Sequence, residues 1–220
     1  MVIVLLGAPG AGKGTQAPIL AARLGVPILA SGDLLRAVAG SGSELGREIQ
    51  STMQAGRLVA DDTIVRIFLD RLDEPEARDG AILDGFPRTR GQAESLDSAL
   101  DERGARVDVA IYIDVPLEEL VGRMAGRLIC ESGGHVYNLA TNPPRVAGRC
   151  DVDGSPLVHR ADDAEATVRA RMAAQLPPLR EVADHYRRRG LLRSVDGRQP
   201  IAAVTEAVLA AVEAERAEST

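Results

Sequence analysis

A glycine-rich segment near the N-terminus has the residue types and spacing of a phosphate site. It reads Gly7-Ala8-Pro9-Gly10-Ala11-Gly12-Lys13-Gly14-Thr15 and lies between an apolar run and a helix-favouring stretch. Glycines let a backbone wrap closely around phosphate oxygens with its N–H groups directed inward, and the N-terminus of the following helix adds partial positive charge. The segment therefore predicts a nucleotide phosphate site, with contacts from Gly10, Ala11, Gly12, Lys13, Gly14 and Thr15.

Lys13 is the only lysine in the chain, and every other one of the 26 basic residues is arginine. A lysine ammonium is a compact charge with three rotatable donors, which the planar fork of arginine cannot imitate at the β- and γ-phosphates. In many phosphate loops the hydroxyl that binds Mg²⁺ follows the lysine directly, whereas here Gly14 intervenes before Thr15. We therefore expect Mg²⁺ bound with the nucleotide, and direct ligation by Thr15 stays open.

A carboxylate ends a second apolar run, Ala81-Ile82-Leu83-Asp84, which predicts a buried strand. At that position Asp84 can hold Mg²⁺ or its waters beside the phosphate loop. The alternative is a strand-end turn residue or a helix cap, and the adjoining Gly85-Phe86-Pro87-Arg88 weakens it.

Other catalytic classes lack their motifs. A GTPase would need an Asn-Lys-x-Asp motif, for which no second lysine exists, and no Gly-x-Ser-x-Gly nucleophile motif occurs. The three histidines, His135, His159 and His185, have no convincing nucleophile partner.

The amino-acid composition disfavours several classes of binding partner. The chain has 220 residues, of which 45% are hydrophobic and 2% aromatic, with a formal net charge of -6. This acidic, aromatic-poor composition disfavours nucleic-acid binding, which needs a basic stripe or a base-stacking platform. The apolar run at 2–6 is too short for a signal peptide or a membrane span, and two cysteines cannot build a disulfide framework. We expect a cytoplasmic protein with no nucleic-acid or membrane partner.

The elements that must hold these residues alternate between strands and helices. Apolar runs predict strands at 2–6, 26–30, 81–84, 107–115 and 191–195. Helical stretches are expected at 13–24, 34–39, 43–55, 61–72, 89–100, 117–124, 162–189 and 201–216. Ser31 or Asp33, Ser43, and Asp61 or Asp62 are the expected N-caps, and Pro177-Pro178 is expected to interrupt its helix. This order predicts a doubly wound parallel sheet, with a turn-rich β subdomain at 128–160 that is typical of a lid.

Taken together, the motifs resemble those of the adenylate kinase family over nearly the whole chain. The resemblance rests on Gly7–Thr15, on Ser31-Gly32-Asp33-Leu34-Leu35-Arg36, on Leu83–Arg88 with Gln92, on Asn142-Pro143-Pro144, on Arg160-Ala161-Asp162-Asp163, and on Thr167-Val168-Arg169-Ala170-Arg171. It implies a P-loop NTP-hydrolase-like, three-layer α/β/α fold with a central parallel sheet. The core would comprise 1–30, 61–126 and 164–220, with a helical AMP-binding insertion at 31–60 and a small β-rich lid at 127–163.

The same resemblance implies a reaction and its residues. The reaction is ATP·Mg + AMP giving two ADP, which serves adenine nucleotide homeostasis and AMP salvage, and the protein is expected to be a monomer. The expected catalytic residues are Lys13, Asp84, Arg88, Arg123, Arg160 and Arg171. Expected ATP contacts beyond the phosphate loop are Arg123, Arg127, Val136, Tyr137 and Gln199. Expected AMP contacts are Ser31, Arg36, Arg57, Leu58, Val59, Gly85, Phe86, Pro87, Arg88, Gln92, Arg160 and Arg171. A surface ion pair is the alternative for each arginine.

Two rival functions remain at this point. Another nucleoside monophosphate kinase is the closest, although the long insertion and Gln92 favour AMP as the acceptor. A nucleotide-binding sensor that has lost its chemistry is the other, and it is disfavoured by the intact set of Lys13, Asp84, Arg88, Arg160 and Arg171.

Some members of that family hold a structural zinc in the lid, with Cys-x2-Cys followed by Cys-x2-Cys or Cys-x2-Asp. This chain has Cys130-x2-Gly133 and Cys150-x2-Asp153, so three positions match and the fourth ligand is absent. A structural zinc needs four ligands in a closed tetrahedron, and the incomplete set therefore disfavours zinc. His135 is a candidate substitute. A Cys130–Cys150 disulfide, which a reducing cytosol disfavours, and a metal-free remnant are the alternatives.

Overall fold

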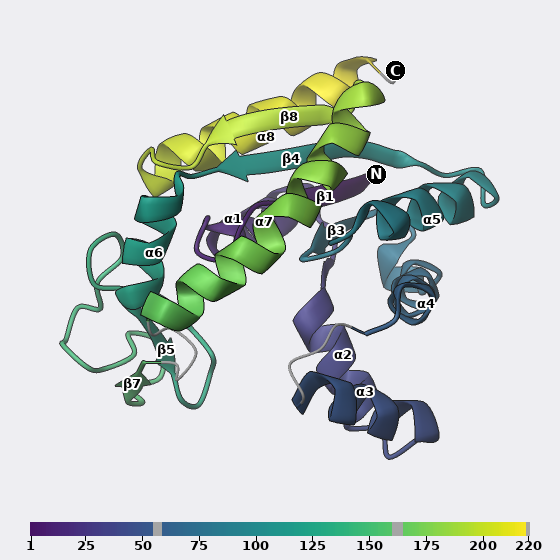
Figure 1. Cartoon of the computed structure of the whole chain (residues 1–220). Coiled ribbons are helices and arrows are strands. Elements are labelled where there is room, and N and C mark those ends of the chain that lie inside the picture. Colours follow the sequence, from purple (N-terminus) through teal and green to yellow (C-terminus); the bar gives the residue numbers. More distant parts are fainter. Residues whose placement is uncertain (55–58, 160–164, 219–220) are drawn as a thin grey trace.

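A five-stranded parallel sheet forms the centre of the protein. The computed structural model describes residues 1–54, 59–159 and 165–218. The strands follow the spatial order β2-β3-β1-β4-β8, and every neighbouring pair is parallel (Figure 1). Their bounds are β1 Val2–Leu6, β2 Ile28–Ala30, β3 Ala81–Asp84, β4 Val107–Asp114 and β8 Leu192–Asp196.

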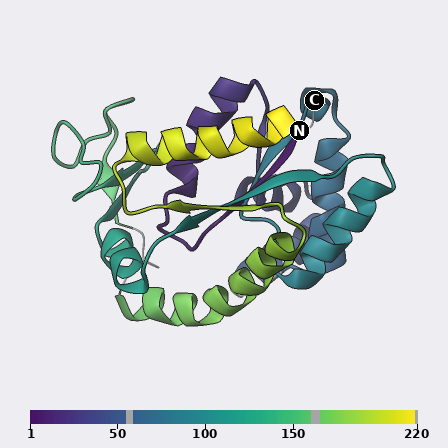
Figure 2. The same ribbon diagram turned by 90° about the horizontal axis from the view of Figure 1, so that it is seen from above.

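Helices cover both faces of this sheet. On one face lie α1 (Lys13–Leu24) and α8 (Ile201–Glu218), and on the other lie α4 (Asp61–Leu72), α5 (Arg90–Asp101) and α7 (Glu165–Arg188) (Figure 2). Helix α6 (Leu117–Ala125) follows β4, and a short 3-10 turn spans Pro75–Ala77. The expected three-layer α/β/α fold is confirmed.

The apolar run of β1 shows why the layers form. Ile3 and Leu5 pack in the core beneath α1 and α8, whereas Val2, Val4 and Leu6 belong to the core beneath α4 and α5. Successive side chains of a strand point to opposite faces, so a strand covered on both faces must be apolar at every position. All five residues of β1 are buried.

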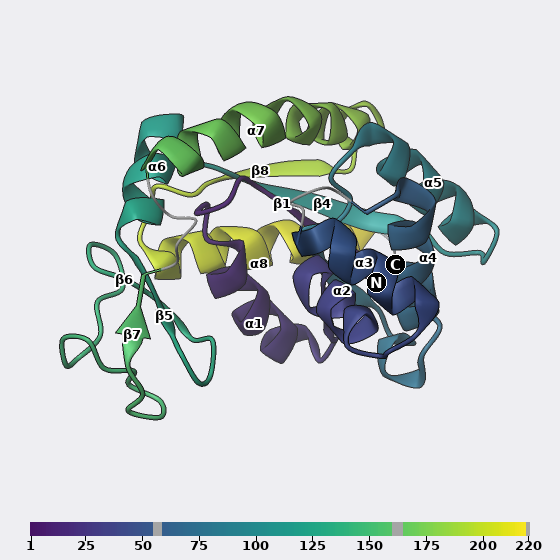
Figure 3. The same cartoon turned by 60° about the horizontal axis from the view of Figure 1, so that its bottom comes forward.

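Two smaller parts project from the same side of the sheet. Helices α2 (Ser31–Ala39) and α3 (Glu44–Gln54) pack on each other, and the antiparallel strands β5 (Arg127–Cys130), β6 (Val136–Asn138) and β7 (Leu157–Val158) form a second sheet in the order β6-β5-β7 (Figures 1 and 3). Of the described helices, none is long and apolar enough to span a membrane.

The structure corrects three local expectations. Helix α7 runs through Pro177 and Pro178 without a break, because its two halves pack into the two separate cores on the sheet. That packing offsets the backbone hydrogen bonds that the prolines remove.

The second and third corrections concern helix starts. Ser31 begins α2 instead of capping it, and Asp61 begins α4, where no side chain caps the helix. Asp61 instead accepts hydrogen bonds from the side chains of Thr89 and Gln92. The expected Ser43 cap is present, since Ser43 Oγ accepts the Gly46 N–H at 2.9 Å.

Candidate active site

A cleft of about 620 Å³ opens at the carboxyl ends of β1 and β3. Ligands of doubly wound sheets bind in this position, where the loops after the strands diverge. The cleft brings together the following predicted residues: Gly10, Ala11, Gly12, Lys13, Gly14, Thr15, Ser31, Asp84, Gly85, Arg88, Arg123, Arg127, Val136, Tyr137 and Gln199.

Glycines with positive φ shape the phosphate loop. Gly10 has φ 85°, and a Cβ added there would lie 3.1 Å from the Met124 side chain. Gly12 has φ 105° and precedes α1, whose N-terminus carries no side-chain cap. The first turn of α1 therefore keeps donor groups for an anion at this wall of the cleft.

Lys13 and Asp84 both line the cleft and lie close enough for their charges to interact. Lys13 Nζ donates to the carbonyl oxygens of Gly7 at 2.7 Å and Ala8 at 3.3 Å. Burial lowers the pKa of Lys13, and the charge of Asp84 opposes that shift. Burial likewise raises the pKa of Asp84, against the charges of Lys13 and Arg88. Each group thus helps the other to stay ionised in a poorly hydrated position.

Because Lys13 is the sole lysine, its titration can be followed directly. Reductive ¹³C-methylation should give one lysine resonance by NMR, separate from that of the N-terminal amine. In nucleotide-free protein we expect it to titrate below the ordinary lysine value of about 10.4, because burial disfavours the ammonium. Asp84→Asn should lower the pKa of Lys13 further, since the opposing charge is lost. A Lys13 that titrates at or above the ordinary value would contradict this environment.

Arg88 joins the segment after β3 to the start of α2. Its Nε donates to the Gly85 carbonyl at 2.7 Å, and its Nη2 donates to Ser31 Oγ at 2.9 Å. The side chain is open to solvent through the cleft, yet protein atoms surround its guanidinium closely enough to lower the pKa of Arg88. Asp84 opposes this shift and Arg171 adds to it, so Arg171 is close enough to contribute charge here. The cations gathered around Asp84 suit a polyphosphate.

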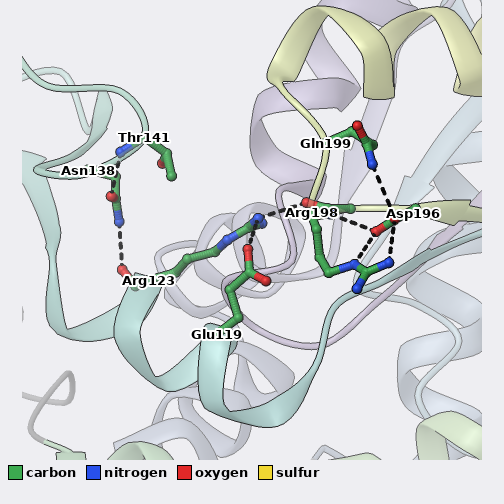
Figure 4. Close-up of polar contacts among 8 residues, drawn as sticks. Glu119, Arg123, Asn138, Thr141, Asp196, Arg198 and Gln199 are labelled. Atoms are coloured by element: carbon green, nitrogen blue, oxygen red, sulfur yellow. Dashed lines mark hydrogen bonds and ion pairs between the residues drawn. The ribbon is translucent and has the colours of Figure 1, made fainter.

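Arg123 lies at the opposite wall, beside the segment after β8. Its Nη2 donates to Glu119 Oε1 at 2.6 Å and to the Gly197 carbonyl at 2.8 Å. In Figure 4 its guanidinium lies between Glu119 and the segment that carries Arg198 and Gln199. Of the described side chains, none accepts a hydrogen bond from the buried Arg123 Nε. A flat guanidinium held in this way can stack on an aromatic base.

Asn138 ties the small sheet to the end of α6. Its Nδ2 donates to the Arg123 carbonyl at 2.7 Å, while its Oδ1 accepts the N–H groups of Ala140 and Thr141 (Figure 4). The amide therefore orders both the helix end and the turn that follows β6.

Several predicted residues on the α2 side lie outside this cleft. Arg36 forms an exposed 2.5 Å ion pair with Asp33. Val59 borders a second cavity of about 230 Å³ beside α3. Pro87 and Phe86 are buried, and the Phe86 ring stacks on Phe68 with centroids 4.1 Å apart. The predicted residues Arg57, Leu58 and Arg160 lie outside the described residues.

Gln92 is buried and hydrogen-bonded at both ends of its amide. Its Oε1 accepts the Arg88 N–H at 2.7 Å, and its Nε2 donates to Asp61 Oδ1 at 2.8 Å. In this arrangement Gln92 holds the Arg88 backbone. To contact adenine, the Gln92 amide would have to give up its hydrogen bond to the Arg88 N–H or to Asp61. Tyr137 is similar, because its hydroxyl accepts the Asp151 N–H at 2.7 Å inside the small sheet's core.

Sequence reasoning missed Asp61, Glu119 and Asn138. Glu119 was detectable, because it stands four residues before Arg123 and this spacing favours ion pairs on a helix. Asp61 and Asn138 had no such signal, since their roles depend on contacts made by the folded chain.

A cluster of four potential metal ligands lies in the small sheet. The ligating atoms of Cys130, His135, Cys150 and Asp153 all lie within 4.8 Å of one another. Both cysteines are free, so the disulfide alternative is not what the structure contains. His135, the candidate substitute, lies at the position that Gly133 leaves without a side chain, so four groups that could hold a metal ion come together here.

Comparison with known proteins places this geometry in a family. The sequence profile described as adenylate kinase matches residues 5–191. The adenylate kinase of Moorella thermoacetica is 46% identical over 208 residues, covering 94% of this chain and 96% of its own. Those of Staphylococcus aureus and Agathobacter rectalis are 43% and 42% identical over 209 residues, covering 95% of this chain and 97% and 98% of theirs. With its phosphate loop, Asp84 and Arg88 converging in one cleft, the chain belongs to the adenylate kinase family.

Proposed function

We infer that the protein transfers the terminal phosphoryl group of Mg·ATP to AMP, reversibly, giving two ADP. The observation that carries this inference is the meeting of Lys13, Asp84 and Arg88 in one cleft at the end of β1 and β3. Direct transfer between two nucleotides needs positioning and charge neutralisation more than a covalent nucleophile. The reaction interconverts adenine nucleotides and returns AMP to the ADP pool.

The walls of the cleft suggest how ATP binds. Its phosphates would lie on the loop at 10–15, where backbone donors and Lys13 are available. The adenine would lie against Arg123 and the segment that contains Gln199, with Arg127, Val136 and Tyr137 completing the site. Arginine and backbone groups suit this task in a chain with few aromatics.

The α2 side suggests how AMP binds. Arg88 and Ser31 already share a hydrogen bond at the cleft, and Arg36 is the exposed cation one turn along α2 from Gly32. Arg36 and Arg88 would bind the AMP phosphate, while Gln92 and the backbone at 57–59 would recognise the base. Arg160 and Arg171 would approach the transferring phosphoryl group.

Mg²⁺ would arrive with ATP. Asp84 offers a hard carboxylate oxygen at the cleft beside Lys13, and the Thr15 hydroxyl also borders the cleft. Oxygen ligands of this kind suit Mg²⁺, which usually keeps several of its waters. Asp84 would therefore hold Mg²⁺ or a water bound to it, with the metal neutralising charge on the β- and γ-phosphates.

The proposal extends to domain organisation and setting. Residues 31–60 would form the AMP-binding part and 127–163 a lid on the core, and lid closure would exclude water so that AMP receives the phosphoryl group. We also propose a monomer that acts in the cytoplasm, with ATP, AMP and ADP as its ligands. Free cysteines fit a reducing compartment.

A coupled assay tests the substrate assignment. With Mg·ATP fixed, ADP formation should be fast with AMP and much slower with UMP or CMP. Rapid turnover of UMP or CMP with AMP inert would assign another monophosphate kinase. Tight ATP binding with no turnover of any acceptor would assign a nucleotide sensor.

A further inference from the structure

The small sheet β5–β6–β7 has a small apolar core. Its buried cluster contains only Leu128, Cys130, Tyr137 and Cys150 among the described residues, with Leu157 packed at the edge. Exposed apolar side chains in the same part are Val136, Leu139, Val146, Val152 and Val158. Units of about 40 residues or fewer usually need a disulfide or a metal, and this unit has no disulfide.

Two matching turns bring four ligating groups together at one edge of this sheet. In each turn the cysteine N–H donates to the carbonyl five residues later, and a glycine N–H returns to the cysteine carbonyl. These pairs are Cys130 with His135 and Gly134, and Cys150 with Ser155 and Gly154, all at 2.9–3.0 Å. Gly134 and Gly154 both have positive φ. The turns therefore share one backbone design.

The third residue after the cysteine distinguishes the two turns. In the second turn that residue is Asp153, whose carboxylate lies 3.3 Å from Cys130 Sγ. In the first turn it is Gly133, which has no side chain, and the His135 ring fills the vacated space. A Cβ added to Gly133 would lie 2.3 Å from His135 Cε1 and 2.7 Å from Nδ1. The His135 ring can occupy this space because residue 133 is a glycine.

The separations fit a tetrahedral metal. With zinc–ligand bonds of about 2.0–2.3 Å, the edges of the tetrahedron are about 3.3–3.8 Å. Cys150 Sγ lies 3.3 Å from His135 Nδ1, which lies 3.6 Å from Asp153 Oδ2. Every pair lies within 4.8 Å, so the widest must shorten by about 1 Å. The Gly133 N–H donates to Cys130 Sγ and the Ser155 N–H to Asp153 Oδ1, which orients both groups.

Some adenylate kinases hold a structural zinc at this place in the small sheet; for this chain we propose that His135 supplies the fourth zinc ligand, beside Cys130, Cys150 and Asp153, because residue 133 is glycine. Two sulfurs, one imidazole nitrogen and one carboxylate form a closed donor set for zinc. The bound ion supplies a cross-link between the two turns. Gly133 and His135 are consequently a pair in which a change at either position removes the ligand.

Metal content of the full-length wild-type protein is the first measurement. Protein purified with a reducing agent and without chelators should contain about one zinc per chain by mass spectrometry of the metal. Removing the metal with a chelator should raise amide hydrogen exchange in 127–159 more than in the β1–β4 core. Zinc well below one per chain in reduced, zinc-supplemented protein would overturn the proposal. An intact mass lower by two hydrogens would indicate a Cys130–Cys150 disulfide in place of two zinc-binding thiolates, and would also overturn the proposal.

Substitutions then test the ligand assignment without any activity measurement. His135→Ala should weaken zinc binding by more than about 100-fold in chelator competition. Removing a residue that only hydrogen-bonds to a ligand already lowers metal affinity by about 10- to 100-fold, and removing a ligand should cost more. His159→Ala, at an exposed histidine of the same part, is the matched control and should bind as wild type does. Equal zinc affinity in the His135→Ala and wild-type proteins would exclude His135 as a ligand.

The glycine gives the sharper arm of the test. Gly133→Ala touches no ligand, yet its methyl group should displace the His135 ring and weaken zinc binding as His135→Ala does. Gly122→Ala, where an added Cβ meets nothing within 4 Å, is the control. Gly133→Cys should displace the ring but supply a sulfur, so His135→Ala in that background should have no further effect. Wild-type affinity in Gly133→Ala, or a full His135→Ala loss in the Gly133→Cys background, would refute the pairing.

Discussion

Replacing Lys13 with arginine should lower kcat/KM for ADP formation from ATP and AMP by about 100- to 1,000-fold, the scale of losing one preorganised charge contact. Lys13 Nζ lies 2.7 Å from the Gly7 carbonyl, on the inner side of the phosphate loop. A planar guanidinium is bulkier and cannot rotate its donors onto phosphate oxygens as an ammonium can. Because this variant keeps the positive charge, a lower kcat/KM would report the geometry of the Lys13 ammonium and not only its charge.

Arg23→Lys is the matched control for Lys13→Arg, because Arg23 is exposed in the last turn of the same helix. We expect it to retain wild-type kinetics, and thermal unfolding should show both variants folded. Amine-directed labelling gives a second readout, since only Lys13 and the N-terminus carry primary amines. Wild-type turnover in Lys13→Arg, or in protein labelled at Lys13, would show that the loop does not work through this ammonium.

Arg88→Ala should reduce kcat/KM by about 30- to 1,000-fold, which corresponds to about 2–4 kcal/mol of transition-state stabilisation. Arg88 is held by the Gly85 carbonyl and Ser31 Oγ, so its guanidinium is ordered before any nucleotide binds. Its removal also leaves Asp84 with one fewer opposing charge. The pKa of Asp84 should therefore rise further, which would shift the acid limb of the pH–rate profile to higher pH.

Arg90→Ala controls for the Arg88 substitution, because Arg90 stands two residues further along the chain and forms an exposed ion pair with Glu94. We expect it to alter kcat/KM by less than about twofold, as surface pairs contribute little. Arg88→Lys separates charge from fork geometry, and partial recovery is expected. An Arg88→Ala variant with wild-type kcat/KM would remove Arg88 from the proposed AMP phosphate site.

Much of the core could be predicted because its signals are local. The run at 2–6, the glycines of the loop and the helix that ends at Gly25 all match the observed β1, loop and α1. An apolar strand buried on both faces and a glycine at positive φ each leave a mark in neighbouring residues. The phosphate loop therefore needed no knowledge of the rest of the fold.

Predictions from local sequence failed where contacts with distant parts of the chain decide the local structure. Asp61 has the residue type of a helix cap, yet its carboxylate accepts hydrogen bonds from Thr89, the N-cap of α5, and from Gln92 in the first turn of that helix. Pro177 and Pro178 have the residue type of a helix break, yet packing against both cores keeps α7 continuous. In both cases a long-range interaction offsets the local preference.

The sequence by itself determined the class of fold, the phosphate loop and the identity of its single lysine, because those features depend on residues adjacent in the chain. Only the tertiary structure decided which partner each polar group has. It brought His135 beside Cys150 across 15 residues, and it placed Arg88 on Ser31 across 57. Such contacts depend on turn geometry and on how helices pack on the sheet, which side-chain spacing along the chain does not encode.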